Sequence, residues 1–324
     1  MRRHLGWALR LLFSGAVLAW LLRDGSLRGQ LAALPLPPRP GWLGAGWLLA
    51  GLGEAVGLLR FWLCLQLAGV TLSLRQAAAL HFCGLFTSLF LPGMAGGDAL
   101  KSGLIALNFP DRKWRGLVAV VMERLSGFLV VTAWLALVAW LRADWFARDG
   151  AARTALAAVL ALAGPPAAAL VAWYLLSRTR LMRTRFRRLP WREYVVRCEI
   201  GFDVFGRHPA RTGAVFAASL AGFASYFSIF HCAALAYRIP LAWQDTMSVM
   251  PLVDLITMLP VTIAGLGLRE QSFQGLLAPL AGIAPAQGVV ISLAGFLLGS
   301  TWALLGAPVF LRLRARFTAA AADA

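Results

Sequence analysis

The sequence predicts an all-α polytopic integral membrane protein with six full membrane spans and two re-entrant or broken helical hairpins, arranged as an inverted-topology repeat. Hydrophobic residues make up 60% of the 324 residues, charged residues make up 14%, and the mean hydropathy is +0.71. Soluble domains have about 45–50% apolar and about 25% charged residues. This composition argues against a soluble dinucleotide-binding enzyme, a disordered tail and a secreted disulfide scaffold.

The six full spans are expected where an apolar segment approaches the roughly 20 residues that a membrane helix needs. They cover residues 5–22, 42–68, 114–141, 155–176, 212–237 and 287–311. The first segment follows Arg2 and Arg3, as the apolar part of a signal peptide would. No clear A-x-A cleavage site follows it, so we interpret it as an uncleaved span.

Two further apolar regions, 74–109 and 241–280, are interrupted near their middle by Pro and Gly. Proline removes a helical hydrogen bond and clustered glycine favours unwinding, so we expect breaks at 91–98 and 259–267. The segment after the first break, 99–109, would be a helix of only about 16 Å, which cannot cross a hydrocarbon core of about 30 Å. We therefore interpret both regions as re-entrant hairpins; two kinked full spans are the alternative.

The net charge of +17 is concentrated in loops. The polar segment 177–211 contains ten arginines, Arg2 and Arg3 precede the first span, and three arginines follow the last one. The positive-inside rule then predicts that this loop and both chain termini are cytoplasmic. We expect the membrane to be the inner membrane of a bacterium. The loop has apolar residues at helical spacing, which suits an amphipathic helix on anionic lipid headgroups. Fixing the topology is the simpler explanation of its charge, and neither reading involves nucleic acid.

With this topology, the chain divides into two halves of opposite orientation within a single membrane domain, 1–150 and 151–324. The local sequences around the breaks agree. Pro92, Gly97 and Lys101 are spaced P-x4-G-x3-K, and Pro260, Gly265 and Arg269 are spaced P-x4-G-x3-R. Inverted repeats with broken helices are typical of transporters, in which the substrate binds near the membrane midplane at the breaks.

Ionisable residues inside apolar segments are costly and are therefore the main candidates for function. Lys101, Arg124 and Arg269 lie at or near the breaks and could together bind a phosphate. An internal lattice of ion pairs is the alternative. The candidate substrate-binding residues are Pro92, Gly96, Gly97, Asp98, Lys101, Glu123, Arg124, Pro260, Thr262, Gly265, Gly267, Arg269 and Glu270. Glu54 and Asp254 are candidates for proton coupling, although Glu54 could equally be a hydrogen-bonded structural acid.

Motifs for chemistry on a bound substrate are absent from the sequence. It contains no C-x-x-C, H-E-x-x-H, G-x-S-x-G or P-loop pattern. His81 and Cys83 form an isolated H-x-C, which is a weak metal signal, and His81 is more readily explained as a structural histidine. We therefore expect no metal, no cofactor and no catalytic residue.

Three stretches in this order resemble the flippase-like transmembrane domain of lysylphosphatidylglycerol synthases and its stand-alone relatives. They are LFTSLFLPGMAGGDALKSGLIA, VVMERLSG and MLPVTIAGLGLRE. The chain departs from the family pattern at Thr87 and Ser88, where Asn is common, at Lys101, where Arg is usual, and at Ile263 and Ala264, where Pro and Gly are usual. The resemblance implies handling of polar lipids by a stand-alone member without the soluble aminoacyl-transfer domain.

We therefore expect a lipid translocase that moves an anionic or phosphate-bearing lipid between the leaflets of the membrane. Its partners would be membrane lipids with anionic headgroups. One alternative is an integral-membrane enzyme that modifies a lipid, with Asp98 and Glu123 as its acids. The other is a non-transporting scaffold that holds a lipid-synthesis enzyme.

Overall fold

The computed structural model describes residues 38–89, 95–177, 205–258 and 265–312, and every regular element in these ranges is a helix. Five helical segments are long and apolar enough to cross a membrane. They are Pro40–Leu67, Pro110–Leu141, Gly150–Ala172, Pro209–Ala236 and Pro285–Arg312. Five of the six predicted spans correspond to these segments, and the predicted span at 5–22 lies outside the described residues, as does most of the basic loop.

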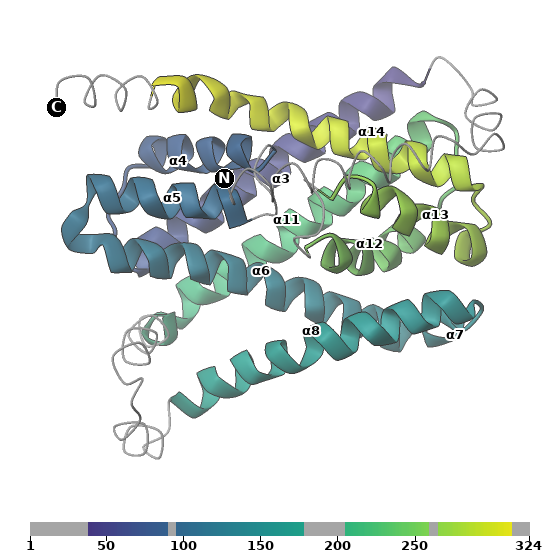
Figure 1. Cartoon of the computed structure of the whole chain (residues 1–324), viewed down its shortest axis with the longest axis horizontal. Helices are drawn as coiled ribbons and strands as arrows, with labels where there is room; N and C mark the ends of the chain where they lie inside the picture. The colour runs from purple at the N-terminus through teal and green to yellow at the C-terminus, as the bar shows by residue number, and fades with distance from the viewer. Residues whose placement is uncertain (1–37, 90–94, 178–204, 259–264, 313–324) are drawn as a thin grey trace, which may run out of the picture.

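The long helices are α3 (Pro40–Leu67), α6 (Lys113–Leu141), α8 (Gly150–Ser177), α11 (Pro209–Ala236) and α14 (Pro285–Ala303), as Figure 1 shows. Several begin at a proline, whose missing N–H costs nothing in the first helical turn. Short turns complete the ends of two of them: η1 (Pro110–Arg112) precedes α6, α7 (Ala143–Phe146) follows α6, and η3 (Leu304–Gly306) follows α14.

Two pairs of half-length helices occupy the predicted hairpin regions. The first pair is α4 (Leu74–Ser88, 15 residues) and α5 (Ala95–Asn108, 14 residues). The second pair is α12 (Trp243–Thr257, 15 residues) and α13 (Leu268–Ala281, 14 residues). Each helix is about 21–22 Å long, too short for a hydrocarbon core of about 30 Å. The two members of each pair pack against each other. Pro92, Pro260 and Thr262 lie outside the described residues.

The first break is shorter than the sequence predicted. Gly96 and Gly97 were expected to be unwound, but both lie in the first turn of α5. The small size of Gly97 serves packing instead, because a Cβ there would collide with the backbone of Gly84 on α4. The glycines that do adopt left-handed backbone conformations near a break are Gly265 and Gly267, with φ of 74° and 85°.

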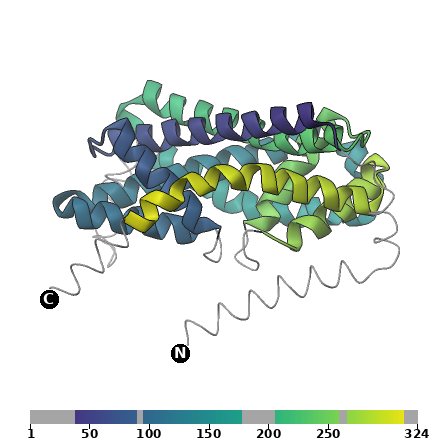
Figure 2. The ribbon, with the colours of Figure 1, turned by 90° about the horizontal axis from the view of Figure 1, so that it is seen from above.

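Helices α3 and α11 form a central antiparallel pair. The N–H of Arg39, before α3, donates to the carbonyl of Ala236 at the end of α11, at 2.9 Å. Further along, Gly46 faces Cys232 and Gly53 faces Ser225. Figure 2 shows α3, α11 and α14 running along the long axis of the molecule. Around this pair, α12 packs on α6, and α4 packs on η3 and α14.

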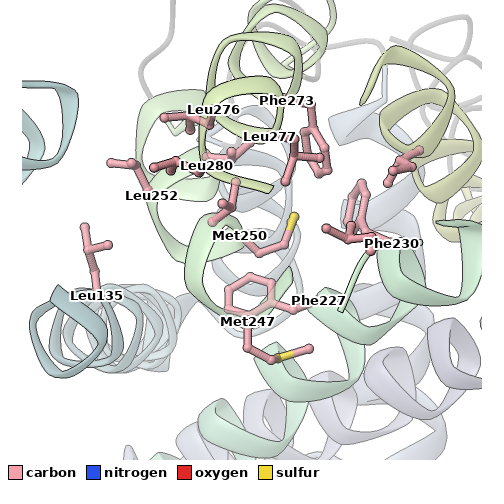
Figure 3. Close-up of a cluster of buried hydrophobic side chains, with 14 of the residues drawn as sticks. Leu135, Phe227, Phe230, Met247, Met250, Leu252, Phe273, Leu276, Leu277 and Leu280 are labelled. Atoms are coloured by element: carbon pink, nitrogen blue, oxygen red, sulfur yellow. The ribbon is translucent and has the colours of Figure 1, made fainter. Parts of the chain in front are cut away.

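A core of buried apolar side chains holds the second half-length pair in place. Figure 3 shows Phe227 and Phe230 of α11 beside Met247 and Met250 of α12, with Phe273 of α13 above them. Phe230 and Phe273 contact each other with ring centroids 5.4 Å apart. Because lipid tails are as apolar as this core, its contribution comes mainly from close packing. The core thereby positions the polar ends of α12 and α13.

Candidate functional site

A cavity of about 360 Å³ lies where the ends of the two half-length pairs meet. Its lining includes Ser88 and Leu89 at the end of α4 and Met258 at the end of α12. Asp98 at the start of α5 and Gly265 just before α13 also line it. The long helices α3, α6, α11 and α14 supply the remaining walls. The cavity is therefore built from both halves of the chain.

The cavity lining is rich in ionisable groups of both signs. Its charged side chains are Glu54, Arg60, Asp98, Lys101, Glu123, Arg124, Asp254 and Arg269, and His81 is also present. Within the part of the chain that the structure describes, four of these are acids and four are bases, so their formal charges cancel when the histidine is neutral. The predicted cationic cluster of Lys101, Arg124 and Arg269 is thus present in the lining, together with Arg60 and four carboxylates.

Most of these groups form one ion-pair network on α3, α5 and α6. Lys101 Nζ lies 3.2 Å from Glu123 Oε2 and 3.8 Å from Asp98 Oδ1. Arg60 Nη2 lies 3.5 Å from Glu123 Oε1, and Arg124 Nε donates to Asp98 Oδ2. Neighbouring helical residues point about 100° apart, which explains why Glu123 and Arg124 have different partners. These pairs match the expected lattice, but they lie within the first half and do not join the two halves.

Close contact between α4 and α5 makes the buried position of Lys101 possible. A Cβ at Gly84 would lie 2.7 Å from Lys101 Cε, so only glycine leaves room for this side chain. The Lys101 ammonium also lies 4.7 Å from the centre of the Phe61 ring. Glycine at positions 84 and 97 therefore determines where this positive charge sits.

Arg269 and Glu270 have different environments although they are adjacent. Arg269 lines the cavity, and its guanidinium lies 5.1 Å from the centre of the Phe296 ring. Glu270 is fully buried and does not line the cavity. Its carboxylate accepts hydrogen bonds from the Gly267 N–H at 2.5 Å and from Ser292 Oγ at 2.7 Å. Glu270 thus fastens the start of α13 to α14, which favours a structural role for Glu270 and Gly267.

Two cavity-lining carboxylates lie apart from the network. Glu54 Oε2 is 3.1 Å from His81 Nε2, which joins α3 to α4. Asp254 on α12 is buried and lies within electrostatic range of both Arg269 and Arg124. The carboxylate of Asp254 therefore lies between basic groups of the two halves.

Two lining residues, Arg60 and His81, were not among the candidate site residues predicted from the sequence. Arg60, within the apolar helix α3, contacts Glu123 and donates to Ser219 Oγ of α11 at 3.4 Å. His81 was expected to be structural, and it does hold Glu54, but it also lines the cavity. The signal for both was a polar side chain within an apolar helix. Among the described residues, no three His, Cys, Asp or Glu side chains are grouped as a metal site would require.

Comparison with known families gives one clear match. The model of the lysylphosphatidylglycerol synthase TM region matches residues 7–316, which includes every helix that lines the cavity. No curated protein matches the chain. The family match therefore supports the resemblance that the three sequence stretches indicated.

Proposed function

Because the chain belongs to the family of the lysylphosphatidylglycerol synthase transmembrane region, a multi-pass membrane family with a lipid-related role, we propose that it is a lipid translocase. In this proposal it moves a lipid with a phosphate-bearing headgroup between the leaflets of the bacterial inner membrane. It acts as a transporter, without chemical change to the lipid. Its partners are then membrane lipids, and a lipid-synthesis enzyme that supplies them.

The observation that carries this proposal is the position of the charged cavity. Two helix pairs too short to cross a membrane end at this cavity, and their ends supply Asp98, Met258 and Gly265 to its lining. Charged side chains at such a depth are expensive unless a ligand or partner uses them. A cavity at the ends of broken helices is the usual substrate site of transporters with inverted repeats.

The packing of the helices supports an inverted repeat with halves 1–150 and 151–324. Each half has a 15-residue and a 14-residue helix in the same order, followed by a long helix. The second span of each half, α3 or α11, pairs with its counterpart in antiparallel orientation. Each half-length pair also packs against the last long helix of the other half. We propose that both pairs are re-entrant and open to opposite sides of the membrane.

The proposed orientation places both termini and the basic loop 177–211 in the cytoplasm. Arg112, Lys113 and Arg115 lie at the start of α6, as the positive-inside rule requires for that end. At the opposite end of α6, Trp140 is exposed, and Trp243 near it is also exposed. Exposed tryptophans at helix ends are typical of membrane–water interfaces.

In the proposed mechanism the lipid headgroup enters the cavity and its acyl chains remain in the bilayer. The guanidinium groups of Arg124 and Arg269, one from each half, bind the phosphate oxygens. Rocking of the two halves about the α3–α11 pair then exposes the headgroup to the other side. Of the two candidates for proton coupling, Asp254 is the proposed site, because it lies within electrostatic range of basic groups from both halves, whereas Glu54 is paired with His81.

Transport can be tested with the purified protein in liposomes that contain lipids labelled on an acyl chain. An impermeant reductant added outside measures how fast each labelled lipid changes leaflet. We expect faster exchange with the protein than without it, and a large loss in the Arg269→Gln variant. The exposed Arg153→Gln variant is the matched control, because Arg153 lies outside the cavity lining. Equal rates with and without protein for all phospholipids would contradict the proposal.

A further inference from the structure

The charges around the cavity indicate which net charge a bound lipid headgroup should carry. An anionic headgroup is best matched by a lining with excess positive charge, but the described residues of the lining include four acids and four bases. Its total therefore suits a ligand whose own charges also cancel. The choice of headgroup rests on the proposed function and concerns which lipid the same cavity carries.

Part of the hydrogen-bonding capacity that remains in the lining belongs to carboxylates. Among the described residues, Asp98 and Glu123 each form ion pairs with two basic side chains, although Asp98 Oδ1 accepts no hydrogen bond there. Glu54 is different: its Oε2 contacts His81, its Oε1 has no hydrogen bond in the described part of the chain, and its side chain is 26% exposed. Asp254 lines the cavity without a hydrogen bond to its carboxylate from any described residue. These two acids can still accept donors from a ligand.

The surroundings of Glu54 favour a positively charged donor group. His81 is buried to more than nine-tenths, and its Nδ1 has no hydrogen-bond partner among the described residues. Its Nε2 is already directed at Glu54, so this pair presents one open carboxylate oxygen to the cavity. An ammonium group carries three N–H donors and a full positive charge, and a carboxylate in a partly enclosed cavity is a partner that suits it.

The acidic and basic parts of the lining are close enough for one headgroup to reach both. The hydroxyl of Tyr226 on α11 lies within electrostatic range of Arg269, Asp254 and Glu54. Arg124, in turn, interacts electrostatically with Asp254 across the two halves. Arg269, Asp254 and Glu54 thus share a neighbour in Tyr226, and Arg124 is connected to them through Asp254.

We infer that the transported lipid has a zwitterionic headgroup, with a phosphate and an ammonium on the same molecule. The phosphate binds Arg124 and Arg269, and the ammonium donates to Glu54, with Asp254 as a second acceptor. Such a headgroup adds no net charge to a lining that is already balanced, so the cost of burying it is lower than for an anionic headgroup.

The test compares two lipids that share a phosphate and differ in the ammonium. Two batches of proteoliposomes are prepared identically, one with acyl-labelled phosphatidylethanolamine and one with acyl-labelled phosphatidylglycerol. The rate at which each labelled lipid changes leaflet is then measured. We expect phosphatidylethanolamine to exchange about tenfold faster, because a hydrogen bond to a charged group is worth more than 1.4 kcal/mol. Faster exchange of phosphatidylglycerol would overturn the inference but leave the translocase intact. Exchange of neither lipid would count against the translocase itself.

Substitution of Glu54 locates the ammonium site. Glu54→Gln keeps the shape and an oxygen acceptor for His81 but removes the charge. We expect this variant to lower the leaflet-exchange rate of phosphatidylethanolamine about tenfold. The exchange rate of phosphatidylglycerol should change less than about twofold. Asp111→Asn, at an exposed position outside the lining, is the control. An equal loss for both lipids would overturn the assignment of Glu54.

If the variants transport lipids too slowly to compare, lipid binding can be measured instead. The unfolding temperature of the detergent-solubilised protein is measured with phosphatidylethanolamine, with phosphatidylglycerol and with soluble glycerophosphoethanolamine. Greater stabilisation by phosphatidylethanolamine than by the other two supports a zwitterionic lipid. Equal stabilisation by the soluble headgroup would retain the zwitterionic chemistry and assign it to a free ligand. Stabilisation by phosphatidylglycerol alone would overturn the inference.

Discussion

Lys101 of α5 and Glu123 of α6 form a buried ion pair, with Nζ and Oε2 3.2 Å apart and both side chains at most 7% exposed. Neither charge has enough contact with solvent to be stabilised by water. Each therefore depends on the other, on Asp98 and on Arg60. This relationship explains how a lysine can lie among apolar helices, and it divides the cavity residues into those that hold the structure and those that can bind a ligand.

Removal of one partner of this pair should destabilise the protein strongly. We expect Lys101→Met or Glu123→Gln to cost about 3–5 kcal/mol, because each leaves a buried charge without its partner. The double variant should be more stable than the sum of the two losses predicts. Unfolding of all variants in detergent gives the coupling energy. A coupling near zero would show that the two side chains do not form this pair in the folded protein in detergent.

The close approach of α4 and α5 gives a second prediction. Gly84→Ala should reduce stability by about 1–3 kcal/mol, because the added methyl group would collide with the Lys101 side chain. Gly103→Ala, on the open side of α5, is the matched control because no atom lies within 4 Å of its added Cβ. The control should be neutral or slightly stabilising. Thermal unfolding followed by circular dichroism measures both, and equal effects would argue against tight α4–α5 packing.

Adjacent positions on α13 should respond differently to substitution. Arg269→Gln should abolish lipid exchange with little loss of folded protein, because Arg269 lines the cavity. Glu270→Ala should instead lower the folded yield and the unfolding temperature, because it leaves the Gly267 N–H and the Ser292 hydroxyl without their acceptor. Size-exclusion chromatography and the exchange assay separate the two effects. A stable but inactive Glu270→Ala protein would place Glu270 in the transport machinery.

A contact at the far end of α6 links the two halves. Arg142 Nη2 lies 2.8 Å from Asp245 Oδ1, Nη1 donates to Ser248 Oγ at 2.9 Å, and the guanidinium lies 4.1 Å from the Trp145 ring centre. Asp245→Asn should lower stability by about 1 kcal/mol, since both side chains are mostly buried. Asp144→Asn, at an exposed position nearby, should have no effect. If both variants unfold at the wild-type temperature, this contact does not stabilise the junction of the two halves.

The sequence by itself determined the class of the protein and the places of its long helices. Apolar length is a local property, so five predicted spans agree with membrane-length helices and both interrupted regions consist of short helices. The costly charges could also be found from sequence, because an ionisable residue in an apolar segment is conspicuous wherever it lies. Lys101, Arg124 and Arg269 were identified in this way and all line the cavity.

Only the tertiary structure decided which of those charges compensate one another. The partner of Lys101 is 22 residues away on another helix, and the pairing depends on how closely α4, α5 and α6 approach. Side-chain direction also separated Arg269, which faces the cavity, from Glu270, which faces Ser292. Charge balance in a cavity is a sum over helices from the whole chain. For that reason the predicted cationic site became a balanced one only when the helices were placed in space.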